Sequence, residues 1–149
     1  MAVRQRTAMS VLRSTLGRTT LEGAMSLRVL VVDDSETTRR ILRLLLGSRQ
    51  DWTVCGEADS GSSGLRKFHQ LKPDVVVLDL AMPDMDGIET AKLMSSGNPK
   101  VPIVLFTILG IEGIQPLAKE AGISAIVPKT EAWSLLGSIE SLVQSHGPN

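Results

Sequence analysis

The sequence predicts a three-layer α/β fold, in which a sheet of five parallel strands lies between two layers of helices. Five short runs of aliphatic and β-branched residues recur along the chain, and a segment with helical character follows each run. The chain has 149 residues, of which 42% are hydrophobic and 21% charged, so it can bury one sizeable core. No apolar run approaches the roughly 20 residues that a membrane-spanning helix needs.

The predicted strands are apolar along most of their length rather than at every second position. Such runs are typical of parallel strands that helices cover on both faces, because neither face meets water. The five strands are predicted at residues 27–32, 52–58, 74–78, 101–106 and 123–127.

The predicted helices follow the strands in turn, at residues 35–50, 61–72, 87–96, 112–122 and 130–145. In the first helix, Ser35 can cap the start and Gly47 lies near the end. One face of that helix is apolar, since it carries Ile41, Leu42, Leu45 and Leu46. Five strand–helix units of this length imply right-handed crossovers, with helices on both faces of the sheet.

The two ends of the chain differ in composition from residues 26–145, which we interpret as one domain. Residues 1–25 hold four arginines against one glutamate, together with several serines and threonines. We expect a disordered tail, or a true start at Met25, although the composition loosely resembles an organellar transit peptide. Residues 146–149 are interpreted as a C-terminal tail.

The charge distribution argues against direct binding of nucleic acid by this domain. Net charge is zero, but beyond residue 25 the chain carries 12 basic and 15 acidic residues. A mildly acidic body with 3% aromatic residues offers neither a basic stripe nor a surface for base stacking.

The single cysteine, Cys55, excludes an internal disulfide and a cysteine-rich zinc site. It lies in an apolar stretch, and we expect it to be a small buried hydrophobic side chain. One cysteine and no predicted membrane span fit a protein of the reducing cytoplasm.

Polar residues follow four of the five predicted strands, where each strand ends. Asp33 and Asp34 follow the first strand, and Asp79 follows the third. Thr107 follows the fourth strand, and Lys129 comes shortly after the fifth. Because open parallel sheets place their ligand sites at the carboxyl ends of the strands, we expect these five side chains to converge.

The three carboxylates of this group would repel one another without a cation. Charged oxygen ligands suit Mg²⁺. A lysine and a hydroxyl around one carboxylate complete a site for phosphoryl transfer, in which positioning and charge neutralisation provide most of the catalysis. Asp79 can then act as the nucleophile and form an aspartyl phosphate.

At these residues the sequence resembles the receiver domain of bacterial two-component response regulators. The resemblance runs from residue 27 to about residue 144 and rests on VVDDS, VVVLDLAMPDMDG, LFT and PK, in the order and spacing of the family. It implies a flavodoxin-like (βα)5 fold with the parallel sheet order 2-1-3-4-5. The sequence of residues 56–91 looks most like that of receivers usually fused to a helix-turn-helix output domain. The 149 residues leave no room for one, so we expect either a stand-alone receiver or a piece of a longer DNA-binding regulator.

The resemblance also implies a role for each site residue. Asp79 would be the phosphoacceptor, Lys129 would contact the phosphoryl group, and Thr107 would move toward that group after transfer. Asp34 and Asp79 would bind Mg²⁺ directly. The other two protein ligands would be Asp33, acting through water, and the backbone carbonyl of Ala81.

The implied function is that of a signalling phosphoacceptor rather than an enzyme. The phosphoryl donor would be a histidine kinase or a phosphotransfer protein, and a downstream protein partner would respond. A homodimer of the phosphorylated form is a further possibility, whereas no membrane association is expected.

Two other function classes are weighed against this one. A Mg²⁺-dependent phosphatase would carry its nucleophile in an Asp-x-Asp pattern on the first strand, and DDSET lacks that pattern. A phosphorylation-independent interaction module is compatible with the departures from the family. These are Ile126 where an aromatic residue is common, Ile108 where a small residue is usual, and Pro128 before Lys129 in place of Lys-Pro. A proline late in the fifth strand is tolerated if that strand lies at the edge of the sheet.

Two features of the helices receive a structural interpretation. Three arginines of the first helix are expected to form a solvated face, with kinase docking as the alternative: Arg39, Arg40 and Arg43. Trp133, near the start of the last helix, is expected to pack against the core or an edge rather than to anchor a partner.

Overall fold

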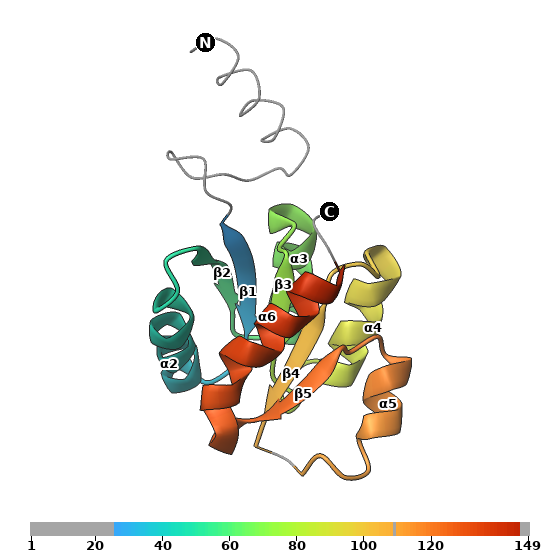
Figure 1. Cartoon of the computed structure of the whole chain (residues 1–149). Coiled ribbons are helices and arrows are strands. Elements are labelled where there is room, and N and C mark those ends of the chain that lie inside the picture. The colour runs from blue at the N-terminus through green and yellow to red at the C-terminus, as the bar shows by residue number, and fades with distance from the viewer. Residues whose placement is uncertain (1–25, 109, 147–149) are drawn as a thin grey trace, which may run out of the picture.

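The computed structural model describes residues 26–108 and 110–146 as alternating strands and helices (Figure 1). The strands are β1 (Leu27–Val32), β2 (Trp52–Ala58), β3 (Val75–Leu78), β4 (Ile103–Thr107) and β5 (Ala125–Pro128). The helices are α2 (Glu36–Gly47), α3 (Gly61–Leu71), α4 (Gly87–Gly97), α5 (Gln115–Glu120) and α6 (Leu135–His146), with a short 3-10 helix, η1 (Lys129–Ser134), before α6. The interpretations of residues 1–25 and 147–149 as tails lie outside the described residues.

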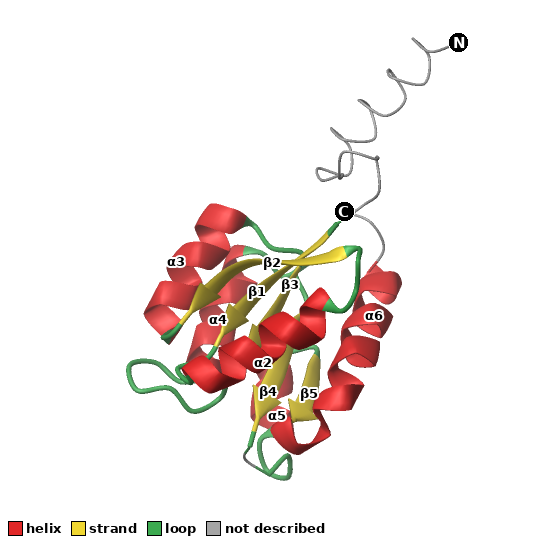
Figure 2. Ribbon diagram, turned by 90° about the vertical axis from the view of Figure 1, so that its left-hand side faces the viewer, coloured by secondary structure: helices red, strands yellow, loops and turns green. Residues whose placement is uncertain are grey.

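The strands form one parallel sheet in the order β2-β1-β3-β4-β5, which confirms the topology predicted from the sequence. Figure 2 shows the strands as a central layer with helices to either side. The β1–β2 register shifts between Val29 and Leu30, whereas the other pairs run without interruption. β5 lies at the edge, so Pro128 at its end interrupts no central ladder, as expected.

The sheet carries an apolar core on each face, because successive side chains of a strand point to opposite sides. Each fully buried aliphatic side chain contributes about 1.5–3 kcal/mol relative to an exposed one. Beneath α3, α4 and α5 lie buried residues such as Leu30, Phe68, Val76, Met94 and Leu105. On the face covered by α2 and α6 the core contains Val31, Leu42, Val77, Val104 and Ile139; in Figure 1, α6 crosses in front of the strands and α2 lies to their left.

The start of α2 follows the predicted capping pattern. Ser35 has an extended backbone, and its side-chain oxygen accepts a hydrogen bond from the Thr38 N–H at 3.2 Å. Leu42 and Leu46 are fully buried, but Ile41 is half exposed. Ile41 therefore lies at the solvent side of the predicted apolar face, because the stripe that meets the sheet is narrower than the apolar pattern.

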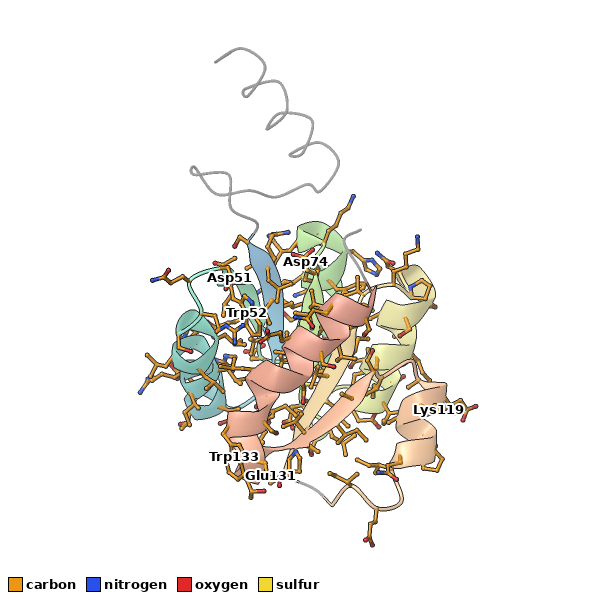
Figure 3. The ribbon with its side chains drawn as sticks, viewed as in Figure 1. Asp51, Trp52, Asp74, Lys119, Glu131 and Trp133 are labelled. Carbon is orange, nitrogen blue, oxygen red and sulfur yellow. The ribbon has the colours of Figure 1, made fainter. Side chains whose placement is uncertain are left out.

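The segment after β5 departs most from the predicted helix at 130–145. Glu131 has a non-helical backbone within η1, and the regular helix begins only at Leu135. Trp133 is 73% exposed, so the expectation that it packs against the core or an edge is wrong. The tighter 3-10 geometry turns its side chain away from the stripe that Leu135 and Ile139 occupy. Figure 3 shows Glu131 and Trp133 at the end of the sheet where β5 ends.

Two expectations drawn from the sequence, on membrane-spanning helices and on the burial of Cys55, can be compared with the structure. Among the described residues, no helix combines the length and the apolar character that crossing a bilayer requires. Cys55 is only partly buried and packs against the core beneath α3, α4 and α5, so its expected apolar surroundings are confirmed and its full burial is not.

Candidate functional site

The polar residues predicted to converge do lie along the carboxyl edge of the sheet. β1 ends immediately before Asp33, and β3 ends immediately before Asp79. Thr107 is the last residue of β4 and lies opposite Pro128, the last residue of β5. Lys129 follows Pro128 directly. Neighbouring parallel strands therefore deliver an acid, a second acid, a hydroxyl and a lysine to one edge.

Asp33 is 1% exposed and is held at its main chain and at both carboxylate oxygens. Its N–H donates to the carbonyl oxygen of Ala58 at 3.0 Å, which extends the β1–β2 ladder by one residue. Its Oδ1 accepts from the Ser35 N–H at 2.8 Å, and its Oδ2 lies 2.8 Å from Nζ of Lys129. A buried carboxylate with partners at both oxygens has little freedom to rotate.

Asp79 shares the same lysine. It is 5% exposed, and its N–H donates to the carbonyl oxygen of Val32 at 2.9 Å, in line with the β1–β3 ladder. Its Oδ1 lies 3.5 Å from Nζ of Lys129, whose side chain is 16% exposed. One lysine thus bridges two buried carboxylates from different strands, and the bridge fixes the distance between β1, β3 and the end of β5.

The loop after Asp79 is shaped by Gly87, which opens α4. The Gly87 N–H donates to the Leu80 carbonyl at 2.7 Å. A Cβ at Gly87 would lie 2.3 Å from the Asp79 carbonyl oxygen, closer than any side chain tolerates. Glycine therefore permits the loop to fold back against the main chain of Asp79. Ala81 lies exposed in this loop, and its carbonyl as a metal ligand stays a prediction.

Three carboxylates at this edge can converge on one metal ion. Asp33, Asp34 and Asp79 each offer an oxygen atom, and these atoms lie within 4.8 Å of one another. Asp34 is exposed, whereas the other two are buried, so one side of the cluster is open to solvent. Oxygen-only donors of high charge fit Mg²⁺, which retains several waters when a few carboxylates bind it. Since Lys129 pairs with two of these three acids, the cluster also has the excess negative charge that a divalent cation would neutralise.

The surroundings of Asp79 disfavour its ionised form. Burial is the main cause and raises the pKa of Asp79 from 3.8 to about 6, and the charge of Asp33 acts in the same direction. Lys129 and a hydrogen bond from the Leu80 N–H lower the pKa and offset part of this rise. A bound cation would further favour the carboxylate form. Asp79 is therefore a buried acid whose ionisation is sensitive to the charges placed around it.

Thr107 and the residues that depart from the family pattern also lie at or near this edge. Thr107 is fully buried at the end of β4, and Nζ of Lys129 lies 6.0 Å from the ring centroid of Phe106. Ile126 is partly buried and packs against the core, whereas Ile108 is largely exposed. The movement of Thr107 toward a phosphoryl group stays a prediction.

One contact near the site was not predicted from the sequence. Asp84, in the loop after Asp79, accepts hydrogen bonds from the N–H groups of Gly61 and Ser62, both at 3.1 Å, and from Oγ of Ser62 at 2.6 Å. The bonds from Ser62 lower the pKa of Asp84 from 3.8 to about 2. Asp84 thereby ties the loop to the first turn of α3. The sequence shows an acid in a turn but not which helix start it reaches.

The expectation that Arg39 belongs to a solvated face is wrong. Its side chain is 17% exposed, its Nη1 donates to the carbonyl oxygen of Asp33 at 2.7 Å, and its Nε lies 3.3 Å from Glu57. Arg43 pairs with the same glutamate at 3.3 Å, and both Arg40 and Arg43 are exposed, as expected. The position of Arg39, one turn beyond the helix cap, was the only sequence signal that it could reach back to the end of β1.

Comparison with known sequences identifies relatives of this region. Residues 29–139 match a family described as the response regulator receiver domain. A protein-glutamate methylesterase/protein-glutamine glutaminase of Nocardioides sp. is 43% identical over 105 residues, which are 69% of this chain and 29% of that protein. The response regulator protein VraR of Staphylococcus saprophyticus is 34% identical over 110 residues, which are 74% of this chain and 53% of that protein. The chain thus spans about a third to a half of these curated relatives.

Solved structures show the same architecture. The response regulator domain of Thermotoga maritima CheB superposes with a TM-score of 0.73 at 31% identity, and the match covers 81% of this chain and 96% of that one. A two-component response regulator of the LuxR family from Aurantimonas sp. gives a TM-score of 0.75 at 30% identity, over 78% of this chain and 84% of that one.

Proposed function

The chain belongs to the response regulator receiver domain family, and on that premise we propose that Asp79 accepts a phosphoryl group in two-component signalling. One observation carries the assignment to this residue. Asp79 is a buried carboxylate at the centre of the acidic edge, and it shares Lys129 with Asp33 across two strands. The other two carboxylates of the cluster lie side by side after β1, where they suit metal binding rather than nucleophilic attack.

In the proposed reaction, a carboxylate oxygen of Asp79 attacks the phosphorus of a phosphohistidine on a histidine kinase or phosphotransfer protein. The P–N bond breaks as the new P–O bond forms, so Asp79 becomes an acyl phosphate and the histidine nitrogen retains the electron pair. Nζ of Lys129, 3.5 Å from Oδ1 of Asp79, is placed to neutralise charge on the transferred group. Thr107, at the end of the adjacent strand, is the proposed hydroxyl partner of that group.

We propose Mg²⁺ as the cofactor, with Asp34 and Asp79 as direct ligands, Asp33 acting through water, and the carbonyl of Ala81 as a further ligand. When bound, the ion would neutralise the charge on the phosphoryl oxygens. The protein's own contribution is to hold the carboxylates in place. Ser35 and Lys129 orient Asp33, and the strand ladder fixes Asp79 at the end of β3.

The output is proposed to be a change in affinity for a downstream protein. A homodimer of the phosphorylated form and a cytoplasmic location belong to the same proposal. No direct nucleic-acid binding is proposed for this domain. The aligned region is 29% of the Nocardioides relative, so we do not extend the enzymatic name of that protein to this chain. The partial coverage of the relatives favours a second candidate, in which this receiver is one part of a longer regulator.

The proposal is tested by intact-mass measurement after incubation with acetyl phosphate. The expected result is the gain of one phosphoryl group in Mg²⁺ and none in a chelator. Asp79→Asn should abolish the gain, whereas Asp59→Asn, an exposed acid just after β2, should retain it. Failure of the native chain to gain mass in Mg²⁺, or equal labelling of the Asp79→Asn variant, would overturn the proposal.

A further inference from the structure

The contact between Arg39 and the main chain of Asp33 points to a residue that acts on the metal site without touching the metal. We propose that Arg39, anchored by Glu57, positions the Asp33–Asp34 turn for binding of a divalent cation. The inference rests on the proposed function, because it assumes that the acidic cluster is a cation site. Arg39 is a positioning residue in this proposal and not a catalytic one.

The carbonyl oxygen that Arg39 holds belongs to the peptide group joining the two acids. Because a peptide group is planar, fixing that oxygen also fixes the N–H of Asp34 and the direction in which the chain enters Asp34. The Asp33 carboxylate has Ser35 and Lys129 as partners of its own. Within the described part of the chain, the Asp34 carboxylate makes no hydrogen bond or ion pair. Its direction therefore depends on the backbone that Arg39 holds.

The guanidinium is itself fixed from the neighbouring strand. Nε of Arg39 lies 3.3 Å from Glu57, and both side chains are largely buried. Glu57 lies opposite Val31 in the β1–β2 ladder, two residues before Asp33. A second arginine, Arg43, pairs with the same carboxylate. The planar fork of Arg39 thus spans β2 and the turn after β1, a geometry that a lysine with one terminal nitrogen cannot reproduce.

The direction in which cation affinity changes when Arg39 is removed distinguishes a positioning role from a purely electrostatic one. A guanidinium close to the acidic cluster repels a cation, so removing it would strengthen cation binding if charge alone mattered. If Arg39 positions the turn, removing it should weaken binding despite the loss of a positive charge. Outer contacts that orient metal ligands are commonly worth about 10–100-fold in metal affinity.

The experiment is a titration of metal-free protein with Mg²⁺, followed by calorimetry and by the amide resonances of Asp33 and Asp34. For Arg39→Gln we expect Mg²⁺ affinity to fall about 10-fold. Arg43→Gln is the matched control, because it removes a guanidinium that pairs with the same carboxylate, Glu57, but makes no contact with Asp33. Its affinity should stay at or slightly above the native value. Arg39→Lys should behave like Arg39→Gln, since it restores the charge and not the fork.

A readout without metal guards against a general loss of folding. In the metal-free state, Arg39→Gln should shift the amide resonances of Asp33 and Asp34 while signals from α4 and β5 stay in place. Glu57→Gln should reproduce part of the affinity loss, and the double variant should lose no more than Arg39→Gln alone, because both changes break one linkage.

The Mg²⁺ affinities of these variants decide whether Arg39 positions the turn. Unchanged or tighter Mg²⁺ binding by Arg39→Gln would overturn the inference, as would equal weakening in Arg39→Gln and Arg43→Gln. In either case native Mg²⁺ binding would leave the proposed function intact. A native chain that binds no Mg²⁺ at the acidic edge would overturn both. Selective weakening in Arg39→Gln and Arg39→Lys supports the positioning role.

Discussion

Lys129 forms ion pairs with two buried acids. It lies 2.8 Å from Asp33 and 3.5 Å from Asp79, and all three side chains are largely removed from solvent. Ion pairs in such places stabilise a protein little in net terms, but the loss of one partner is costly because the other charge is left buried and unpaired. Burial of the acids and their pairing with Lys129 oppose each other, so single substitutions at the site can either lower or raise the stability of the protein.

Lys129→Met should destabilise the metal-free protein, because it leaves two buried carboxylates without their cation. We expect a loss of about 3 kcal/mol in the free energy of unfolding, measured by urea titration. Mg²⁺ should restore part of the loss. Lys119→Met, on the exposed face of α5 (Figure 3), is the matched control and should change little. Equal losses in the two variants would contradict this account.

Asp79→Asn should stabilise the metal-free protein above pH 6. The pKa of Asp79 is about 6 in the folded chain and 3.8 for the ordinary group, so the folded state holds the proton more tightly. The stability that this proton provides is fully present below pH 4 and is lost as the pH rises through 6. The variant avoids that loss, and we expect it to be more stable than the native chain by about 1–3 kcal/mol at pH 7.5 in chelator.

Denaturant titrations of both proteins at pH 4 and pH 7.5 test this expectation. The advantage of the variant should be small at the lower pH and larger at the higher one. An advantage of the same size at both values would show that burial of the charged carboxylate is not what the substitution relieves.

At the scale of elements, the loop between β3 and α4 is anchored at two points. Gly87 lets the loop return close to the main chain of Asp79, and Asp84 caps α3 through Gly61 and Ser62. Anions and carboxylates are favourable at helix starts because unpaired N–H groups point toward them. The loop that follows Asp79 is therefore tied to a neighbouring helix by hydrogen bonds that depend on a charge.

Asp84→Asn should lower the urea midpoint at neutral pH. The depressed pKa of Asp84, about 2, means that its contribution is present above pH 4 and is lost as the pH falls toward 2. The difference between variant and native chain should therefore shrink in acid. Midpoints at pH 7 and at pH 3 measure this, with Asp59→Asn as an exposed control. A difference that does not change with pH would argue against a charge-dependent cap.

The strands and most helices could be predicted because their signals are local. Runs such as residues 75–78 and the cap at Ser35 act within a few residues, and the structure places them where the sequence indicates. The 3-10 geometry of residues 129–134 could not be predicted, because their composition is helical while their backbone is set by the turn out of β5. α5 is shorter than the helix predicted at residues 112–122, because the ends of this helix depend on tertiary packing rather than on helix propensity.

At the scale of the whole molecule, the parallel topology itself builds the site. Asp33, Asp79 and Lys129 come from distant parts of the sequence and meet because β1, β3 and β5 end at one edge. That convergence was predictable, since all strands of a parallel sheet end at the same edge. The Arg39 and Asp84 contacts were not, because each depends on which way a side chain turns from a helix or loop toward a backbone group.

Removal of residues 1–24 should leave the domain folded. β1 begins at Leu27, whose N–H already donates to the Asp51 carbonyl at 2.7 Å, and its ladders with β2 and β3 are complete from there. A chain starting at Met25 should melt within about 4 °C of the full chain, since no more than about 1 kcal/mol should be lost. Scanning calorimetry of the two proteins tests this, and a much larger drop would show that the missing residues pack on the domain.

The central claim, that Asp79 is the phosphoacceptor, is tested most directly by locating the modified residue. Borohydride reduction after treatment with acetyl phosphate and Mg²⁺ converts an aspartyl phosphate to homoserine, which peptide sequencing by mass spectrometry assigns to one position. We expect homoserine at residue 79 and unmodified aspartate at Asp33 and Asp34. Homoserine at another acid, with Asp79 intact, would contradict the account.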